Sequence, residues 1–192
     1  MIVLICLAYE KTNIFPVMTR LSYEESCRRL QEHHLDPDSI PPIPDRLPQA
    51  DDLEPSGVSF FRVFLGDRED MSNLTLPRTF FGRSEFNGVR FCNTELTESN
   101  LCWNDFIDVD FSSAVLTHSD LRASLFDRVR FTGADLSFAD LRQSSFVQCD
   151  FGEAIMTGVI MTHAGGKALE LSEKQRQEIA WTDNEGPEPA GG

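Results

Sequence analysis

Residues 126–145 read FDRVRFTGADLSFADLRQSS, and a large apolar residue stands at every fifth position of this stretch. The same spacing runs from Phe81 to Met161 without slipping. A small or medium-sized residue stands two places before each large one. A period of five matches neither the 3.6-residue period of a helix nor the two-residue period of a strand. The pattern therefore predicts a repeat architecture.

A second period, four pentapeptides long, lies over the first. From Phe86 the large residues follow the order Phe, Phe, Leu, Leu and then start again, with methionine ending the last cycle. Four pentapeptides therefore predict one turn of a square coil, with coils stacked about 4.8 Å apart. Two of the expected internal columns consist of phenylalanine: Phe86, Phe106, Phe126 and Phe146 in one, and Phe91, Phe111, Phe131 and Phe151 in the other.

Three short segments carry a family resemblance. Ala134-Asp-Leu136, Ala139-Asp-Leu141 and Ser119-Asp-Leu121 resemble the A(D/N)LXX consensus of the pentapeptide-repeat family, and the resemblance covers about residues 76–165. It implies a mainly β fold, a right-handed quadrilateral β-helix, here with about four coils. It says little about function, because unrelated proteins use the same scaffold and function resides in surface sites.

The sequence before the repeat predicts an N-terminal non-repeat segment over residues 1–75. Ser22-Tyr-Glu-Glu25 has the pattern of a capping box and predicts a helix over about 22–35, with Tyr23, Cys27 and Leu30 on one side. Residues 36–57 hold six prolines and predict an extended linker. Residues 58–65 have strand composition and predict a capping strand that pairs with the first coil.

After the repeat, residues 166–181 predict a C-terminal capping helix. Its start signal lies at Leu171-Ser172, and Leu171, Ile179 and Trp181 are available to cover the open end of the coil. Residues 182–192 predict a disordered tail.

Cysteine usage and the first residues bear on the cellular compartment. The five cysteines have no CxxC spacing and predict free thiols in a reducing compartment, so we expect a cytoplasmic protein. Residues 1–17 lack the pattern of a signal peptide. They are either an upstream extension before a start at Met18 or the first element of a cap.

The charge of the chain excludes some functions. Net charge is −14, which repels phosphate backbones and anionic membranes, so neither nucleic acid nor membrane is an expected direct partner.

The four histidines do not form a recognisable metal site, and no phosphate-binding or catalytic motif occurs. We therefore expect no enzyme activity, no catalytic residues, no metal and no cofactor.

Acidic side chains form one set of candidate partner-binding residues. In the predicted register, Asn100, Asp120 and Asp140 line up on one outer edge, and Asp105 follows Glu85 in another column. Regularly spaced carboxylates resemble a phosphate backbone. The alternative is that these residues satisfy backbone groups in the turns, as the family consensus implies.

Two aromatic residues form the second set. Trp103 and Phe138 fall two places after a core residue and are therefore expected to point outward. Exposed large aromatics are typical anchors of protein interfaces. The alternative is contact with a terminal segment that folds back along the coil.

These observations predict a non-enzymatic, acidic protein-binding module. The family resemblance implies two versions. In the first and favoured one, the protein is an immunity- or antitoxin-type inhibitor that neutralises a toxin, such as a nuclease, by direct binding. In the second, it is a DNA mimic that binds DNA gyrase or topoisomerase IV and protects against quinolones. A structural scaffold is a third alternative, and the oligomeric state, a homodimer included, stays open.

Overall fold

The computed structural model describes residues 19–32, 58–66 and 69–186. Three predictions concern residues outside these ranges: the start at Met1 or Met18, the linker 36–57, and residues 187–192 of the tail. The described elements, in chain order, are α1 (Tyr23–Glu32), β1 (Ser59–Phe61), β2 (Phe64–Leu65), β3 (Phe80–Gly82), β4 (Glu85–Asn87), β5 (Asp105–Ile107), β6 (Leu125–Asp127), β7 (Ser145–Val147), β8 (Ile160–Thr162), α2 (His163–Gly166), α3 (Glu173–Glu178) and β9 (Ala180–Thr182).

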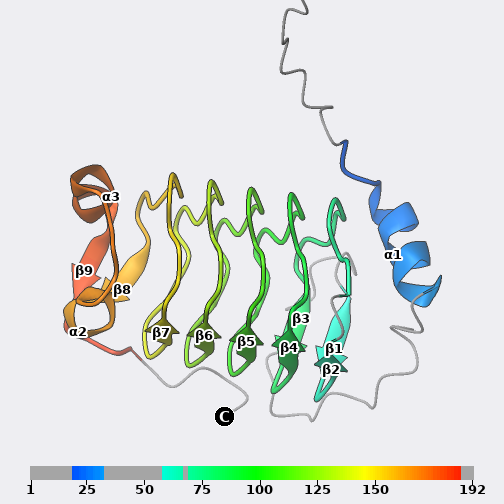
Figure 1. Cartoon of the computed structure of the whole chain (residues 1–192), viewed down its shortest axis with the longest axis horizontal. Helices are drawn as coiled ribbons and strands as arrows, with labels where there is room; N and C mark the ends of the chain where they lie inside the picture. Colours follow the sequence, from blue (N-terminus) through cyan, green and yellow to red (C-terminus); the bar gives the residue numbers. More distant parts are fainter. Residues whose placement is uncertain (1–18, 33–57, 67–68, 187–192) are drawn as a thin grey trace, which may run out of the picture.

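The β elements form a stack of short parallel rungs, a β-solenoid, as the sequence predicts (Figure 1). β2, β4, β5, β6 and β7 pair in that order, each in parallel with the next. Phe106 of β5 lies directly between Phe86 and Phe126, so equivalent positions are separated by four pentapeptides. We call the outer surface of this sheet the strand face.

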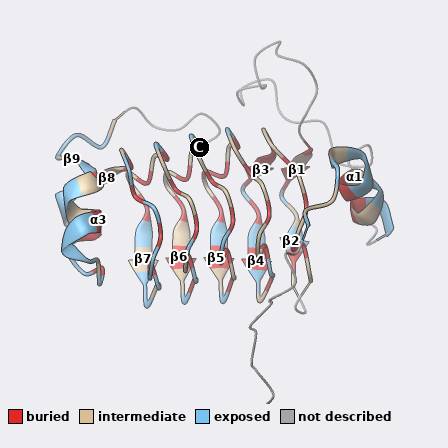
Figure 2. Cartoon of the chain, turned by 90° about the horizontal axis from the view of Figure 1, so that it is seen from above, coloured by how far each residue is buried: buried red, intermediate tan, exposed pale blue. Residues whose placement is uncertain are grey.

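The interior of the solenoid is filled by the large residue of each pentapeptide (Figure 2). Phe106 stacks on Phe86 and Phe126, with ring centroids 5.0 and 5.1 Å apart, and it meets Phe111 edge to face at 5.5 Å. Stacked and edge-on rings each add about 0.5–1.5 kcal/mol to the stabilisation from burial. The leucine and methionine columns expected from the repeat are also buried: Leu96, Leu116, Leu136, Met156, Leu101, Leu121, Leu141 and Met161.

Small polar residues two places before the large ones satisfy the inner backbone. Asn104 Oδ1 accepts the Ser84 N–H at 2.8 Å, and its Nδ2 donates to Phe81 O at 2.7 Å. Ser124 Oγ accepts the Asn104 N–H at 3.1 Å in the next coil. Because a buried, unpaired backbone group costs about 1–3 kcal/mol, these side chains stabilise the coil as well as fill it.

The corners of the solenoid impose a left-handed backbone. Among the residues that the structure describes, sixteen non-glycine residues have positive φ, between 50° and 62°, and they include Trp103 and Phe138. Each stands two places after a large inward residue, where the chain turns from one face to the next. A left-handed conformation costs a non-glycine residue about 1–2 kcal/mol, so stacking of the coils must offset strain at every such corner.

The solenoid has about six turns, because it extends on both sides of residues 76–165, over which the sequence predicts about four coils. Residues 58–65 are the first part of the coil itself, since β1 pairs with β3 and β2 pairs with β4 in parallel. Ser59 pairs with Phe80, whereas Glu85 pairs with Asp105, so the first spacing is longer than the later ones by a single position. Because of this difference in register, the five-residue period does not continue into the first turn, and a search for that period does not detect it.

α1 covers the N-terminal end of the solenoid. Ser22 and Glu25 form the predicted capping box, with Ser22 Oγ accepting the Glu25 N–H at 3.2 Å and Glu25 Oε2 accepting the Ser22 N–H at 3.0 Å. Leu30 is fully buried against the first coil. Ser26 Oγ accepts the Thr75 N–H at 2.8 Å. The helix thus provides both an apolar cover and a polar partner for the first rung.

The C-terminal end departs from the predicted helix 166–181. Ser172 caps α3 with a capping box, but the helix ends at Glu178, and Trp181 lies in β9, paired with Met161 of β8. The physical reason is the open edge of the last coil: Val159 O accepts the Ala180 N–H at 2.8 Å, and a strand satisfies such groups where a helix cannot. Trp181, Ile179 and Leu171 pack against the core.

The predicted disordered tail also needs correction for residues 182–186. Thr182 belongs to β9, and Glu185 binds Gln143 on the side of the solenoid. Hydrogen bonds to the solenoid therefore order this segment.

Candidate functional site

Two corners of the solenoid flank the surface on which Asn100, Asp120 and Asp140 lie. These three residues pair in parallel from coil to coil, as predicted, and we call their surface the Asp120 face. The Trp103 corner, on one side, consists of Arg62, Arg83, Trp103, Ala123 and Gln143. The Phe138 corner, on the other side, consists of Arg78, Glu98, His118, Phe138 and Gly158. Asp105 lies outside the Asp120 face, on the strand face beside Glu85 and Leu125.

The acids of the Asp120 face are ion-paired within the molecule. Arg122 donates from Nε and Nη2 to Asp120 at 2.8 and 2.7 Å, and Arg142 binds Asp140 in the same two-pronged way. Arg122 Nε also lies 3.6 Å from Asp140 Oδ2. Asn100 Oδ1 accepts from the Cys102 Sγ at 2.8 Å. Asp120 and Asp140 are thus paired with arginines of their own chain, and each Oδ1 also accepts the backbone N–H two residues later at 3.1 Å, as the alternative of turn stabilisation expects.

A second surface repeats this arrangement. Asp70, Arg90, Asp110, Arg130 and Asp150 form one column with alternating charge, which we call the Asp110 face. Arg130 Nη1 lies 2.6 Å from Asp110 Oδ2. Burial alone would raise the pKa of Asp110, but hydrogen bonds from Ser112 and the charge of Arg130 outweigh it and hold the pKa below its usual value. The Asp110 carboxylate is therefore stabilised as an anion by its own chain.

Phe138 points outward as predicted, with 53% of its surface exposed, but its ring contacts its own corner. The imidazole of His118 stacks on it at a centroid distance of 4.9 Å. On the other side it lies against Gly158, where an added Cβ would come within 2.7 Å of the ring. Phe138 thus forms part of a local stack along the Phe138 corner.

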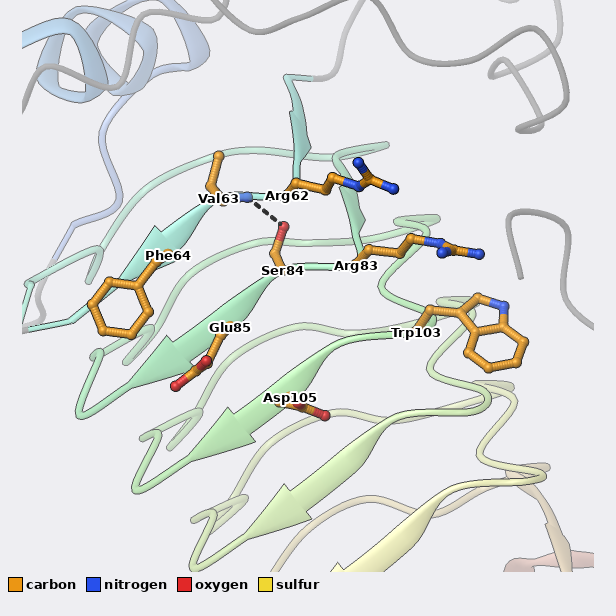
Figure 3. Close-up of a pocket in the computed structure, with 8 residues that line it drawn as sticks. All are labelled: Arg62, Val63, Phe64, Arg83, Ser84, Glu85, Trp103 and Asp105. Carbon is orange, nitrogen blue, oxygen red and sulfur yellow. Dashed lines mark hydrogen bonds between the residues drawn. The ribbon is translucent and has the colours of Figure 1, made fainter.

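Trp103 lies in a different setting, an open groove of about 550 Å³ between the Trp103 corner and the strand face (Figure 3). Arg62, Arg83 and Trp103 project side by side from the corner, whereas Phe64, Glu85 and Asp105 lie on the strand face. Phe64 is 64% exposed, the largest value among the exposed large apolar residues of the described chain. The floor of the groove is formed by Val63 and Ser84.

The groove has two walls of different charge. The corner wall carries the guanidinium groups of Arg62 and Arg83, both on exposed residues, and the Arg62 guanidinium carbon lies 5.3 Å from the centre of the Phe61 ring. The opposite wall carries the carboxylates of Glu85 and Asp105, also on exposed residues. The described structure thus brings Trp103 and Asp105 together in one groove and leaves Asn100, Asp120, Asp140 and Phe138 outside it.

Sequence reasoning missed Arg62, Phe64 and Arg83. Arg83 stands two places after Phe81, so the same rule that selected Trp103 could have found it. Arg62 stands two places after Phe60 in the same way, but the shifted register of the first turn concealed it. No sequence signal marked Phe64 as exposed, because it lies in a continuous apolar run.

Comparison with family models identifies the repeat. Residues 84–123 match the model described as "Pentapeptide repeats (8 copies)", and residues 126–165 match "Pentapeptide repeats (9 copies)". The chain is a pentapeptide-repeat protein. No curated protein matches its sequence.

One solved structure of another pentapeptide-repeat protein, HetL, shares the fold, and further solved structures are similar to parts of the chain. HetL from the cyanobacterium Nostoc sp. strain PCC 7120, a protein involved in heterocyst differentiation regulation, is 16% identical, with a TM-score of 0.52. The match covers 54% of this chain and 49% of HetL, about half of each. QnrB1, a plasmid-mediated fluoroquinolone resistance protein, is 17% identical over 67% of this chain and 76% of its own, with a TM-score of 0.41. A protein from the Arabidopsis thaliana thylakoid lumen is 25% identical over 57% and 69%, with a TM-score of 0.31.

The groove is lined by charged, aromatic, aliphatic and hydroxyl side chains. Ser84 is the only hydroxyl in its lining, and its Oγ accepts the Val63 N–H at 3.2 Å and donates to Gly82 O at 3.1 Å. In the part of the chain that the structure describes, no three His, Cys, Asp or Glu side chains come together as a metal site requires. Within the same residues, no helix is long and apolar enough to cross a bilayer. Guanidinium groups, carboxylates and two aromatic rings make up most of the groove lining.

Proposed function

We propose that this pentapeptide-repeat protein is a non-enzymatic protein-binding module of the immunity or antitoxin type, which inhibits a partner toxin by docking it in the groove of the Trp103 corner. One observation carries the proposal: Trp103, Arg62, Arg83 and Phe64 lie together on an otherwise polar surface. Tryptophan and arginine are the residues most enriched among those that dominate binding energy at interfaces.

The scaffold supports this role through rigidity. The groove residues project from coils that are held by continuous parallel pairing and by the phenylalanine columns beneath them. A preformed surface loses little conformational entropy on binding, and this favours tight inhibition by a small module. We place the protein in the cytoplasm, in keeping with the free thiols of Cys27, Cys92, Cys102 and Cys149.

The ion pairs of the Asp120 face bear on which kind of toxin the geometry favours. Because Arg122 and Arg142 neutralise Asp120 and Asp140, the Asp120 face does not imitate a phosphate backbone. The same pairing argues against the topoisomerase alternative, which depends on that mimicry. A nuclease is supported only by the overall charge of −14, which speeds association with any basic partner.

The proposal is tested by affinity capture with wild-type protein, Trp103→Ala and the matched control Phe138→Ala, followed by quantitative mass spectrometry. We expect one protein whose recovery falls at least about tenfold with Trp103→Ala, a loss typical of an interface anchor, and is unchanged with Phe138→Ala. Co-expression must then show that the wild type suppresses the toxicity of that protein. Equal recovery with all three baits would remove the groove as the binding site.

The alternatives predict different results in the same samples. Recovery of gyrase or topoisomerase IV, with an effect of the purified protein in a supercoiling assay, would replace the inhibitor proposal by the topoisomerase version. A partner that binds the groove without loss of its activity would instead indicate a scaffold.

A further inference from the structure

The carboxylates of Glu85 and Asp105 stand directly opposite each other on the strand face. The two residues pair in parallel register between β4 and β5, both are exposed, and both line the groove. Neighbouring rungs lie about 4.8 Å apart. None of the hydrogen bonds and ion pairs that the described side chains form involves either carboxylate. Like charges directly opposite each other in a sheet are destabilising, and no cation of the described chain offsets this repulsion.

A second acid pair of neighbouring coils shows how this solenoid neutralises such charges. Asp120 and Asp140 also stand opposite each other, but Arg122 lies between them. Its Nη2 is 2.7 Å from Asp120 Oδ2, and its Nε is 3.6 Å from Asp140 Oδ2. One guanidinium group thus bridges two stacked carboxylates. Glu85 and Asp105 have the same spacing, and within the described chain no guanidinium group bridges them.

Apolar side chains frame the exposed acid pair. Phe64 precedes Glu85 in the same column, and Leu125 follows Asp105. Phe64 is 64% exposed, whereas Leu125 and Ile107, two residues after Asp105 on β5, are half-buried. The column is therefore apolar, acidic, acidic and apolar in order. This order fits a cationic side chain that has apolar neighbours.

We propose that the strand face binds an arginine of the partner protein, whose guanidinium group bridges Glu85 and Asp105 and lies against the ring of Phe64. Apolar neighbours of that arginine pack on Leu125. This inference rests on the proposed function and names the residue by which the partner docks. Arginine fits better than lysine, because a planar guanidinium group can donate to two carboxylates at once and stack on an aromatic ring.

The charges around the acid pair favour a cation that comes from another molecule. Arg62 and Arg83 project from the corner wall of the groove, away from Phe64 and Glu85 (Figure 3). The described ion pairs join neither arginine to Glu85 or Asp105. The net charge of −14 adds long-range attraction for a basic partner and repels nucleic acid.

The test uses the full chain and the blocked tripeptide Leu-Arg-Leu. Two control peptides carry citrulline, a neutral isostere of arginine, or lysine in its place. Nuclear magnetic resonance measures affinity from the shifts of the strand-face amides. We expect saturable binding of the arginine peptide that weakens with salt. The citrulline peptide should bind at least about tenfold more weakly, the loss expected for a charge-assisted hydrogen bond, and the lysine peptide about threefold more weakly.

The variant Glu85→Gln keeps the test independent of folding. It removes the repulsion within the pair, so the unfolding equilibrium constant in urea should fall about twofold. It also removes one of two anions, so the arginine peptide should bind at least about threefold more weakly. A folding defect cannot produce a more stable protein that binds less.

Two further variants locate the site. Phe64→Ala should weaken binding of the arginine peptide about threefold, since it removes a ring that a guanidinium group can stack on. Glu95→Gln is the matched control. It removes a carboxylate two pentapeptides along the chain, half a turn from the strand face, and should leave binding unchanged.

Equal binding of the citrulline peptide, unchanged binding by Glu85→Gln, or no binding at all would overturn the arginine site. Equal binding of the lysine peptide would overturn the bridging guanidinium group. If any of these results occurs while Trp103→Ala still loses a cellular partner, the proposed function stands and only the docking residue is wrong. If Trp103→Ala loses no partner but the arginine peptide binds as expected, the arginine site stands without the inhibitor role.

Discussion

The Trp103 corner and the Phe138 corner are built alike but differ in what surrounds their aromatic residues. Both residues stand two places after a leucine, both have φ near +60°, and both flank the Asp120 face. The ring of Phe138 stacks on His118 and lies against Gly158. Trp103 instead lines an open groove with arginines, carboxylates and the exposed Phe64.

This difference shows that an outward aromatic residue in a solenoid can serve two purposes. At one corner it extends the stacking of equivalent positions to the outside of the coil, which stabilises the fold. At the other it follows Arg62 and Arg83 in the same column and lies beside charged groups, the setting to which we assign partner binding. The residues at the equivalent position of the neighbouring coils decide between them.

The largest loss of stability is expected from truncating a core phenylalanine inside the strand face. Phe106→Ala should cost about 3–5 kcal/mol of unfolding free energy, because its fully buried ring stacks between Phe86 and Phe126 directly inside the strand face. Urea denaturation followed by far-ultraviolet circular dichroism measures the loss.

Phe146→Ala is the matched control, since it truncates the same column at its end. Phe146 is only half-buried and has a ring on one side within its column. A loss as large as that of Phe106→Ala would show that column position has no influence on stability.

A smaller loss of stability is expected from a substitution at the Phe138 corner, which lies outside the groove. Gly158→Ala should destabilise the protein by about 1–2 kcal/mol, because Gly158 has φ +68° and a Cβ there would meet the Phe138 ring at 2.7 Å. In the Phe138→Ala background the steric part should vanish, so in a double-mutant cycle in urea the double mutant should lose less stability than the sum of the two single losses. Additive losses would mean that Phe138 does not pack on Gly158.

The smallest effect is expected at the equivalent position of the other corner. Ala123→Gly should stabilise the fold by up to about 1 kcal/mol, because Ala123 has φ +53° and glycine relieves this strain at a smaller entropic cost. Thermal denaturation measures the gain. A clear loss of stability would show that the corner backbone is not strained, and unchanged Trp103 fluorescence serves as the control for the groove.

The repeat could be predicted from sequence because each coil makes the same contacts. Phe91, Leu96 and Leu101 each recur four pentapeptides later, so one spacing fixes the columns and the outward direction of Trp103 and Phe138. The end elements were less predictable. The strand β9 forms where a helix was expected, because the last coil offers backbone groups at its open edge. The first turn, at β1, is displaced by one residue relative to the spacing of the later turns.

The amino-acid sequence by itself determined the solenoid, its four-sided core and the positions that face outward, since these follow from two nested periods that need no knowledge of distant contacts. Only the tertiary structure decided which outward residues meet. It paired Asp120 with Arg122 and Asp140 with Arg142, placed Phe138 in a stack, and assembled Arg62, Phe64, Arg83 and Trp103 into a groove. The physical reason is that burial constrains residue type at each inner position, whereas surface side chains are selected by neighbours from other coils and by the rotamers that let them bond.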